Sequence, residues 1–193
     1  MVRSHNEDCF RCLTLGQYAL FVIADGMGGH DAGEIASRIA VDTVCDGVRT
    51  GIQQMQDPLV LVSDAVRKAN AAVNQEGTSR RSNMGTTLGV VFVSNNEAFV
   101  ANVGDSRVYW IDNGSITQVT ADHSLVAKLV SAGKLTKEEA RNHPRANLLY
   151  RTVGIDEAVA VDTFRIRLKR GGSLMLCTDG LWGMVPDEEI REV

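Results

Sequence analysis

The chain has 193 residues, of which 44% are hydrophobic and 23% charged, a composition that suits one globular domain with a substantial core. Its formal charge is −4, from 20 basic and 24 acidic residues, and without a long basic run it is not expected to bind nucleic acid. No stretch approaches the ~18 apolar residues of a membrane span, and residues 1–8 lack the apolar core of a signal peptide, so we expect a cytoplasmic protein that does not enter a membrane.

A buried strand is predicted over residues 18–24, which form an apolar run rich in aromatic and β-branched side chains. The run stops at Asp25, and Gly26 follows. A buried strand should not end in an unpaired charge, and a cation is the simplest partner because its field keeps the carboxylate ionised. Taken alone, an Asp-Gly pair after a strand is more often a turn.

The middle of the chain separates into a helical part and a strand-forming part. Apolar residues recur at helical spacing over residues 35–44 and 59–73, which predicts two amphipathic helices. An antiparallel meander follows, with hairpin signals at Asn95-Asn96 and Asp112-Asn113-Gly114. Its strands are predicted at 87–94, 98–103, 107–111 and 115–118. This segregation favours an α+β fold over a doubly wound parallel sheet.

Residues 122–154 are rich in Lys, Arg, Glu, Asn and His and are predicted to be a mostly helical insert. One helix should end at Gly133 and another should begin at Thr136, with Glu139 in the capping-box position. The insert contains His123 and His143, but no local spacing connects either of them with the acidic clusters.

Two later strands also end at an aspartate beside a glycine, and this repetition changes the interpretation of Asp25. The acidic positions are Glu7 and Asp8 near the start, then Asp25, Asp105 and Asp179. Independent turns would not all need an aspartate at a strand end, so we predict one polynuclear metal site. Oxygen ligands favour magnesium or manganese over zinc or copper. Cys9 and Cys12 form a lone Cys-x-x-Cys without a second pair at zinc spacing, and none of the four cysteines is assigned a role.

Five short motifs, in order along the chain, resemble those of a known family. They are Arg3-x-x-Asn6-Glu7-Asp8, Asp25-Gly26-Met27-Gly28-Gly29-His30, Met84-Gly85-Thr86-Thr87, Gly104-Asp105-Ser106-Arg107 and Asp179-Gly180-Leu181. Together they resemble the metal-dependent protein serine/threonine phosphatases of the type 2C (PPM) family, bacterial branch. The resemblance covers essentially the whole chain and implies one domain over residues 1–193. The implied fold is a four-layer α-β-β-α sandwich of two antiparallel sheets flanked by helices. It also implies a mobile helical flap at about 122–154, although an ordinary solvated connection is an equal alternative.

With this resemblance, the acidic residues take roles in the dephosphorylation of phosphoserine and phosphothreonine in proteins. The nucleophile would be a hydroxide bridging the metals of a binuclear manganese or magnesium centre. Asp25 would bridge the two cations, with the Gly26 carbonyl as a further ligand. Asp179 would hold the first metal and Glu7 the second, while Asp8 would orient metal-bound water. Asp105 matches the family position that, with Asp179, contributes to a third, weaker metal site.

Two cationic residues complete the expected mechanism. Arg3 is the candidate phosphate-binding group, because a planar guanidinium pairs with two phosphate oxygens at once. His30 is the candidate general acid, because its ordinary pKa of about 6.5 suits proton donation near neutrality. A lone histidine in a glycine-rich loop is otherwise more often structural. The expected partners are phosphorylated proteins, the targets of a serine/threonine kinase, and the chain is expected to be a monomer.

The chain also departs from the family pattern. Family members carry a further strand before the first motif and an Asp-Asn pair on a late strand, and residues 1–193 contain neither. We therefore expect a chain truncated at both ends that lacks one metal ligand. The second hypothesis is then a catalytically weak fragment or pseudophosphatase that binds a phosphoprotein or a kinase. A metal nuclease is disfavoured, because the chain lacks the basic surface that nucleic acid requires.

Overall fold

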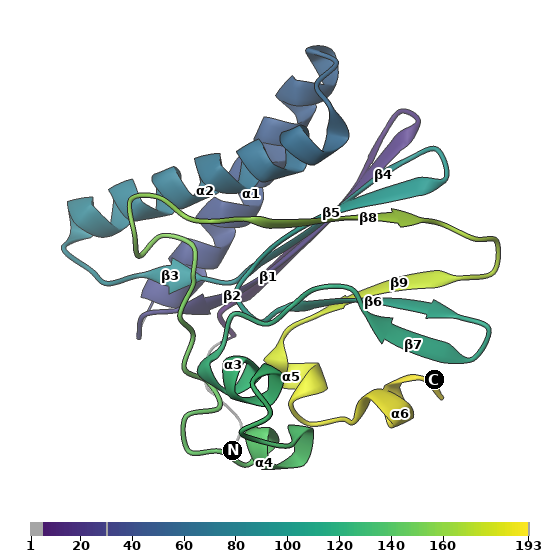
Figure 1. The fold of residues 1–193 in the computed structure, drawn as a ribbon. Helices are drawn as coiled ribbons and strands as arrows, with labels where there is room; N and C mark the ends of the chain where they lie inside the picture. Colours follow the sequence, from purple (N-terminus) through teal and green to yellow (C-terminus); the bar gives the residue numbers. More distant parts are fainter. Residues whose placement is uncertain (1–5, 30, 193) are drawn as a thin grey trace.

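The computed structural model describes residues 6–29 and 31–192, which build two antiparallel β-sheets with helices beside them (Figure 1). The larger sheet has the strand order β1-β2-β4-β5-β8, and β3 pairs with the end of β2. Its strands are β1 (Asp8–Leu15), β2 (Tyr18–Met27), β3 (Gly85–Thr86), β4 (Leu88–Ser94), β5 (Glu97–Val103) and β8 (Asp162–Arg167). The smaller sheet has the order β7-β6-β9, from β6 (Arg107–Asp112), β7 (Ser115–Gln118) and β9 (Ser173–Cys177).

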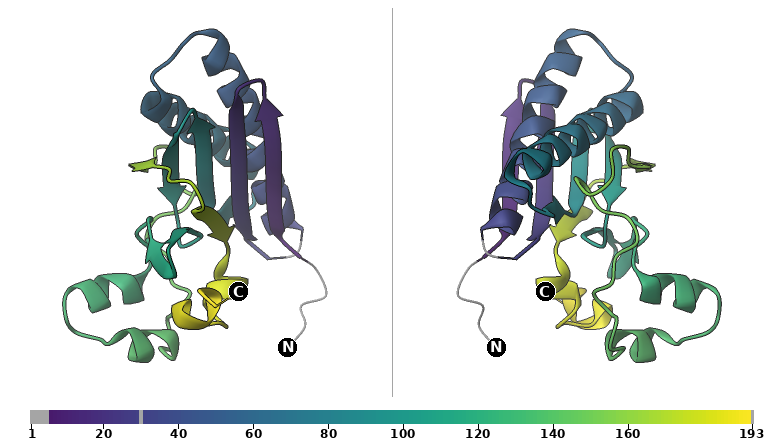
Figure 2. Two further views of the ribbon diagram at one scale, coloured as in Figure 1. Left: turned by 90° about the vertical axis from the view of Figure 1, so that its right-hand side faces the viewer. Right: turned by 90° about the vertical axis from the view of Figure 1, so that its left-hand side faces the viewer.

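Two long helices, α1 (Ala32–Gln53) and α2 (Pro58–Arg80), cover one face of the larger sheet (Figures 1 and 2). The start of α2 is fixed by Asp57, whose side chain accepts a hydrogen bond of 2.9 Å from the backbone N–H of Leu59. The apolar sides of both helices form the main core with the sheet, and its buried members include Leu20, Val22, Val44, Val48, Val62, Val66, Leu88 and Val90.

A second, smaller core lies between the two sheets. Val91, Ala98 and Val100 from the larger sheet pack with Val108 from β6, and all four side chains are buried. Because helices cover one face of the larger sheet and the second sheet covers the other, apolar residues point to both sides of its central strands. The predicted α+β fold of two antiparallel sheets flanked by helices is confirmed.

Short helices gather at one end of the smaller sheet (Figure 1). They are α3 (Leu125–Ser131), α4 (Lys137–Arg141), α5 (Asp179–Trp182) and α6 (Asp187–Ile190). The capping box predicted at the start of α4 is present, with Thr136 and Glu139 exchanging hydrogen bonds of 2.7 and 3.1 Å. Helices α3 and α4 project to one side of the sheets (Figure 2), and the mobility of this segment stays a prediction.

The predicted end of the first buried strand was wrong. Strand β2 does not stop before Asp25 but continues to Met27. The reason is tertiary: Gly26 and Met27 pair with Thr86 and Gly85 of β3, a two-residue strand with no apolar pattern of its own. Asp25 therefore lies within the strand, one residue before this last pairing.

Candidate active site

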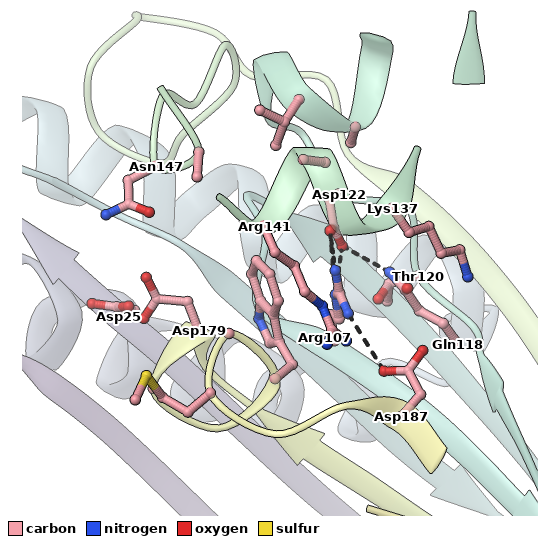
Figure 3. A pocket seen from close by; sticks show the side chains of 18 of the residues that line it. Asp25, Arg107, Gln118, Thr120, Asp122, Lys137, Arg141, Asn147, Asp179 and Asp187 are labelled. Atoms are coloured by element: carbon pink, nitrogen blue, oxygen red, sulfur yellow. Dashed lines mark hydrogen bonds and ion pairs between the residues drawn. The ribbon is translucent and has the colours of Figure 1, made fainter. Parts of the chain in front are cut away.

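Acidic side chains from three separate parts of the chain line one pocket with a volume of about 860 Å³. Asp8 at the start of β1 is opposite Asp25 in the strand register, and Asp179 enters from the start of α5. Figure 3 shows the carboxylates of Asp25 and Asp179 next to each other. Glu7 also lines the pocket, and the Thr178 hydroxyl donates a hydrogen bond of 3.4 Å to Asp8 Oδ2. The structure thus brings together acidic residues that the sequence predicted would meet.

Hydrogen bonds to the main chain fix the position of Asp25. Its backbone N–H donates to the Thr87 hydroxyl at 2.9 Å, and its carbonyl accepts from the Thr87 N–H at 2.9 Å. The Thr86 hydroxyl donates to the same carbonyl at 2.8 Å. Both threonines belong to the third motif, which therefore has a local role in holding the end of β2.

Two glycines allow the start of α1 to approach the site closely. A Cβ atom on Gly26 would lie 2.0 Å from the carbonyl oxygen of Gly33, and a Cβ on Gly33 would lie 2.7 Å from Glu7 Cδ. Glu7 is held by its own carbonyl, which accepts hydrogen bonds from the Gly26 N–H at 3.1 Å and the Ser37 hydroxyl at 2.7 Å. Larger residues at either glycine would therefore displace the Glu7 side chain or its backbone.

Asp105 lies in the turn between β5 and β6 and is only 6% exposed. The turn begins at Gly104, which has a φ of +99°. Ser106 ties the turn to β4 and β2, because its hydroxyl is 2.6 Å from the Thr87 hydroxyl. Asp105 is not among the residues that line the pocket, but its charge interacts with that of Asp179.

The crowding of buried acids changes their pKa values. Burial, followed by the charges of Asp179 and Asp8, raises the pKa of Asp25 from 3.8 to about 8. Burial, followed by the charges of Asp179 and Asp122, raises the pKa of Asp105 from 3.8 to about 7. Both raised pKa values have the same cause: each carboxylate would have to ionise in a poorly hydrated site that already carries negative charge. Such a site favours a positive ion.

The donor atoms suit a hard divalent cation. They are carboxylate oxygens, together with backbone carbonyls at the end of β2, and these are the ligands that magnesium and manganese prefer. Within residues 6–29 and 31–192, no three or more His, Cys, Asp or Glu side chains are grouped closely enough to hold an ion as they stand. The acids therefore share a pocket and repel one another without already forming a complete coordination shell.

The whole chain matches a known protein family. A family model described as protein phosphatase 2C matches residues 2–192. The chain belongs to this family. It is 36% identical to the serine/threonine phosphatase stp of Listeria monocytogenes, over 100% of this chain and 78% of that protein. It is 38% identical to the protein phosphatase PhpP of Streptococcus pneumoniae, over 90% of this chain and 72% of that protein.

Solved phosphatase structures have the same fold. The Mycobacterium tuberculosis serine/threonine phosphatase PstP/Ppp superposes with a TM-score of 0.87 at 35% identity, covering 100% of this chain and 80% of that one. The catalytic domain of PstP in complex with two manganese ions gives a TM-score of 0.84 at 33% identity, covering 100% and 79%. The protein described here is thus a phosphatase 2C-type serine/threonine phosphatase, a hydrolase.

One wall of the phosphatase pocket was missed in the sequence. Arg107, Asp122 and Trp182 all line it (Figure 3 labels the first two). The Arg107 guanidinium pairs with both oxygens of Asp122 at 2.7 and 3.1 Å and lies 3.7 Å from the centre of the Trp182 ring. Arg107 also donates a hydrogen bond of 2.7 Å to the Tyr109 hydroxyl.

Two predicted residues of the phosphatase site, Arg3 and His30, lie outside the described residues. Their proposed contacts with phosphate and with the leaving group therefore stay predictions.

Proposed function

We propose that the acidic pocket is the metal centre of this phosphatase. The protein ligands of the two principal cations are Glu7, Asp25, the Gly26 carbonyl and Asp179, with Asp8 beside them as an orienting group and Asp105 at a third, weaker site. The observation that carries this proposal is the close approach of Asp25 and Asp179, which burial and mutual repulsion make unfavourable without a compensating positive charge.

The chemistry follows from that charge arrangement. When bound there, two divalent cations would lower the pKa of water so that hydroxide is available near neutral pH for in-line attack on the phosphorus of phosphoserine or phosphothreonine. Asp25 would bridge the two cations, Asp179 would hold the first and Glu7 the second, and Asp8 would orient the attacking water by accepting a hydrogen bond. Arg3 grips two phosphate oxygens, and His30 gives a proton to the departing serine or threonine Oγ. The support for Arg3 and His30 is their position in the two N-terminal motifs.

Manganese is the favoured cation, because the PstP catalytic domain, similar to this chain, was solved with two manganese ions. The oxygen donors of the pocket also suit magnesium, which demands a more regular octahedral arrangement. The assay below compares turnover with manganese and with magnesium, and so decides between the two cations.

The substrates of this phosphatase are phosphoproteins. We infer that they are targets of a serine/threonine kinase and that the chain acts as a monomer in the cytoplasm. In the described part of the chain, none of the helices combines the length and the apolar character that crossing a membrane requires.

The deciding experiment is hydrolysis of a phosphothreonine peptide by the purified chain with manganese, with magnesium and with a chelator. The test variant is Asp25→Asn, which keeps the side-chain shape and removes the charge. The matched control is Asp46→Asn on α1, because Asp46 is 78% exposed and pairs with Arg49 of the same helix at 3.0 Å.

Metal-dependent turnover that is lost in Asp25→Asn and kept in Asp46→Asn supports the proposed centre. Turnover that persists in chelator, or full activity of Asp25→Asn with metal, contradicts it. A folded chain without turnover under any condition would instead support the weak-fragment hypothesis.

A further inference from the structure

His123 is buried directly behind the turn that carries Asp105. The residue is 1% exposed, and it lies between β7 and the start of α3. Ring atom Nδ1 accepts a hydrogen bond of 3.0 Å from the backbone N–H of Gly104. The backbone N–H of His123 donates to the Gly104 carbonyl, also at 3.0 Å. His123 thus forms hydrogen bonds with both the backbone N–H and the backbone carbonyl of Gly104.

These bonds fix the tautomer of the ring. Because Nδ1 accepts a hydrogen bond from a backbone N–H, a neutral ring must carry its own hydrogen on Nε2. Nε2 lies 3.2 Å from Asp162 Oδ2 and can donate to it. Arg151 Nη1 is 3.0 Å from Nε2 but is itself a donor, so its hydrogen bond is the 2.6 Å contact with Asp162 Oδ1. Asp162 therefore joins the ring to Arg151.

The groups that face His123 come from several elements. They are Asp162 on β8, Arg151 after the helical insert, Asp122 beside it in the chain, and the Tyr150 ring, whose centroid is 5.7 Å away. Burial is the main cause that lowers the pKa of His123, the Asp162 hydrogen bond opposes it, and the Arg151 charge lowers it further. Protonation of Nδ1 would break the bond from Gly104.

The backbone of Gly104, the residue that His123 holds, cannot readily adopt another conformation. Gly104 has a φ of +99°, and a Cβ there would lie 2.7 Å from the Thr87 side chain. On the other side of Asp105, Ser106 is tied to Thr87 at 2.6 Å. His123 thus holds the turn at Gly104 and Thr87 holds it at Ser106, the residues before and after Asp105.

We propose that His123 is a positioning residue of the metal centre: its Nδ1 holds the Gly104 amide and thereby aims the Asp105 carboxylate at the cation that Asp105 shares with Asp179. This inference rests on the proposed role of Asp105 as a metal ligand. It also links the base of the 122–154 segment to the centre, because the His123 carbonyl accepts a hydrogen bond of 2.9 Å from the Tyr150 N–H. Groups that orient metal ligands typically affect metal affinity or activity by about 10–100-fold.

Two substitutions separate the two ring nitrogens. His123→Asn places an amide oxygen near the position of Nδ1 and keeps an acceptor for Gly104. His123→Gln reaches toward the position of Nε2 and loses that acceptor. His143→Gln is the matched control, because His143 lies in the same segment and its Nδ1 accepts a local hydrogen bond of 3.1 Å from the Arg145 N–H.

The readouts are manganese binding by calorimetry, the manganese dependence of kcat and of the peptide KM, and thermal unfolding in chelator. We expect His123→Gln to weaken binding at the weakest manganese site by about 10-fold or more, against less than about 3-fold for His123→Asn. Both variants should lose similar stability in chelator, and His143→Gln should match the parent. Equal effects of the Asn and Gln variants on manganese affinity, or none, would overturn the proposal.

Two further measurements keep the test decisive. Asp105→Asn must weaken the same manganese site; if it does not, the proposed ligand role fails, and the His123 inference fails with it. If His123→Gln does not fold, ¹⁵N NMR of the parent with magnesium decides. A protonated Nε2 with an unprotonated Nδ1 supports the clamp, and a protonated Nδ1 overturns it.

Discussion

The buried ion pair between Arg107 and Asp122 should contribute far more to stability than an exposed pair of the same geometry. The two side chains are 14% and 9% exposed, and three hydrogen bonds of 2.7, 3.1 and 3.2 Å join them. Arg107 also donates to the Tyr109 hydroxyl at 2.7 Å and stacks on Trp182. Removing one partner leaves the other charge buried with less compensation.

The perturbation is Arg107→Met, which keeps much of the apolar stem and removes the guanidinium. The remaining Asp122 carboxylate keeps one hydrogen bond, of 2.7 Å, from the Gln118 amide. Loss of one member of a buried pair typically costs about 3–5 kcal/mol of unfolding free energy. Asp122→Asn should cost a similar amount, and the double variant should fall short of additivity by about 2–3 kcal/mol, because both changes remove the same interaction.

The chain supplies a matched control in Arg165 and Glu97. Their bidentate contacts of 2.8 and 2.9 Å resemble those of the buried pair, but the side chains are 60% and 29% exposed. Arg165→Met should therefore lower the free energy of unfolding much less than Arg107→Met does.

Urea unfolding at pH 7 in chelator measures these free energies, with comparison limited to variants whose m-values match the parent. Equal losses for Arg107→Met and Arg165→Met would refute the argument from burial. Simple additivity of Arg107→Met and Asp122→Asn would show that the two side chains act independently.

The acidic centre and the turn beside it give three further expected outcomes. In chelator at pH 7, Asp25→Asn should unfold at a higher temperature than the parent by calorimetry, because Asp25, whose pKa is raised to about 8, must take up a proton to be buried next to Asp179, whereas an amide need not; a lower midpoint would count against the repulsion. Gly104→Ala should lose about 1–3 kcal/mol in urea unfolding, since its Cβ would lie 2.7 Å from Thr87; an unchanged midpoint would show that the turn adapts. The lowered pKa of His123 contributes stability that is full above the unfolded pKa of about 6.5 and is lost as pH falls through the folded value. Unfolding free energy should therefore drop more steeply from pH 7 to 5 in the parent than in His123→Asn, and parallel curves would contradict this.

Turns and helix starts were predictable from the sequence because they depend on few residues. Asn95 and Asn113 adopt φ values of +55° and +49°, the left-handed conformation that Asn tolerates in tight hairpins. The capping box of Thr136 and Glu139 is equally local. The acidic pocket residues assigned to the metal site, among them Asp8, Asp25 and Asp179, were also indicated by local patterns, because each belongs to one of the short motifs.

The residues of the other pocket wall were not indicated by any local sequence pattern. Asp122 and Lys137 reach it only because the 122–154 segment folds back beside α5, and neither stands in a motif. Likewise, the extension of β2 to Met27 depends on β3, whose two residues have no strand pattern. His123 lacked any spacing that tied it to the carboxylates, because its link to Asp105 passes through the backbone of Gly104 and becomes visible only in three dimensions.

Uncharged hydroxyl groups hold this acidic centre through its main chain. Thr86 and Thr87 bond to the backbone of Asp25, and Ser37 bonds to the backbone of Glu7. These hydrogen bonds fix the backbone position of each acidic residue and do not occupy its carboxylate, which lines the pocket. Substituting Asp25 by Asn should therefore leave the strand end in place, so that lost turnover in that variant reports on the charge and not on a disordered loop.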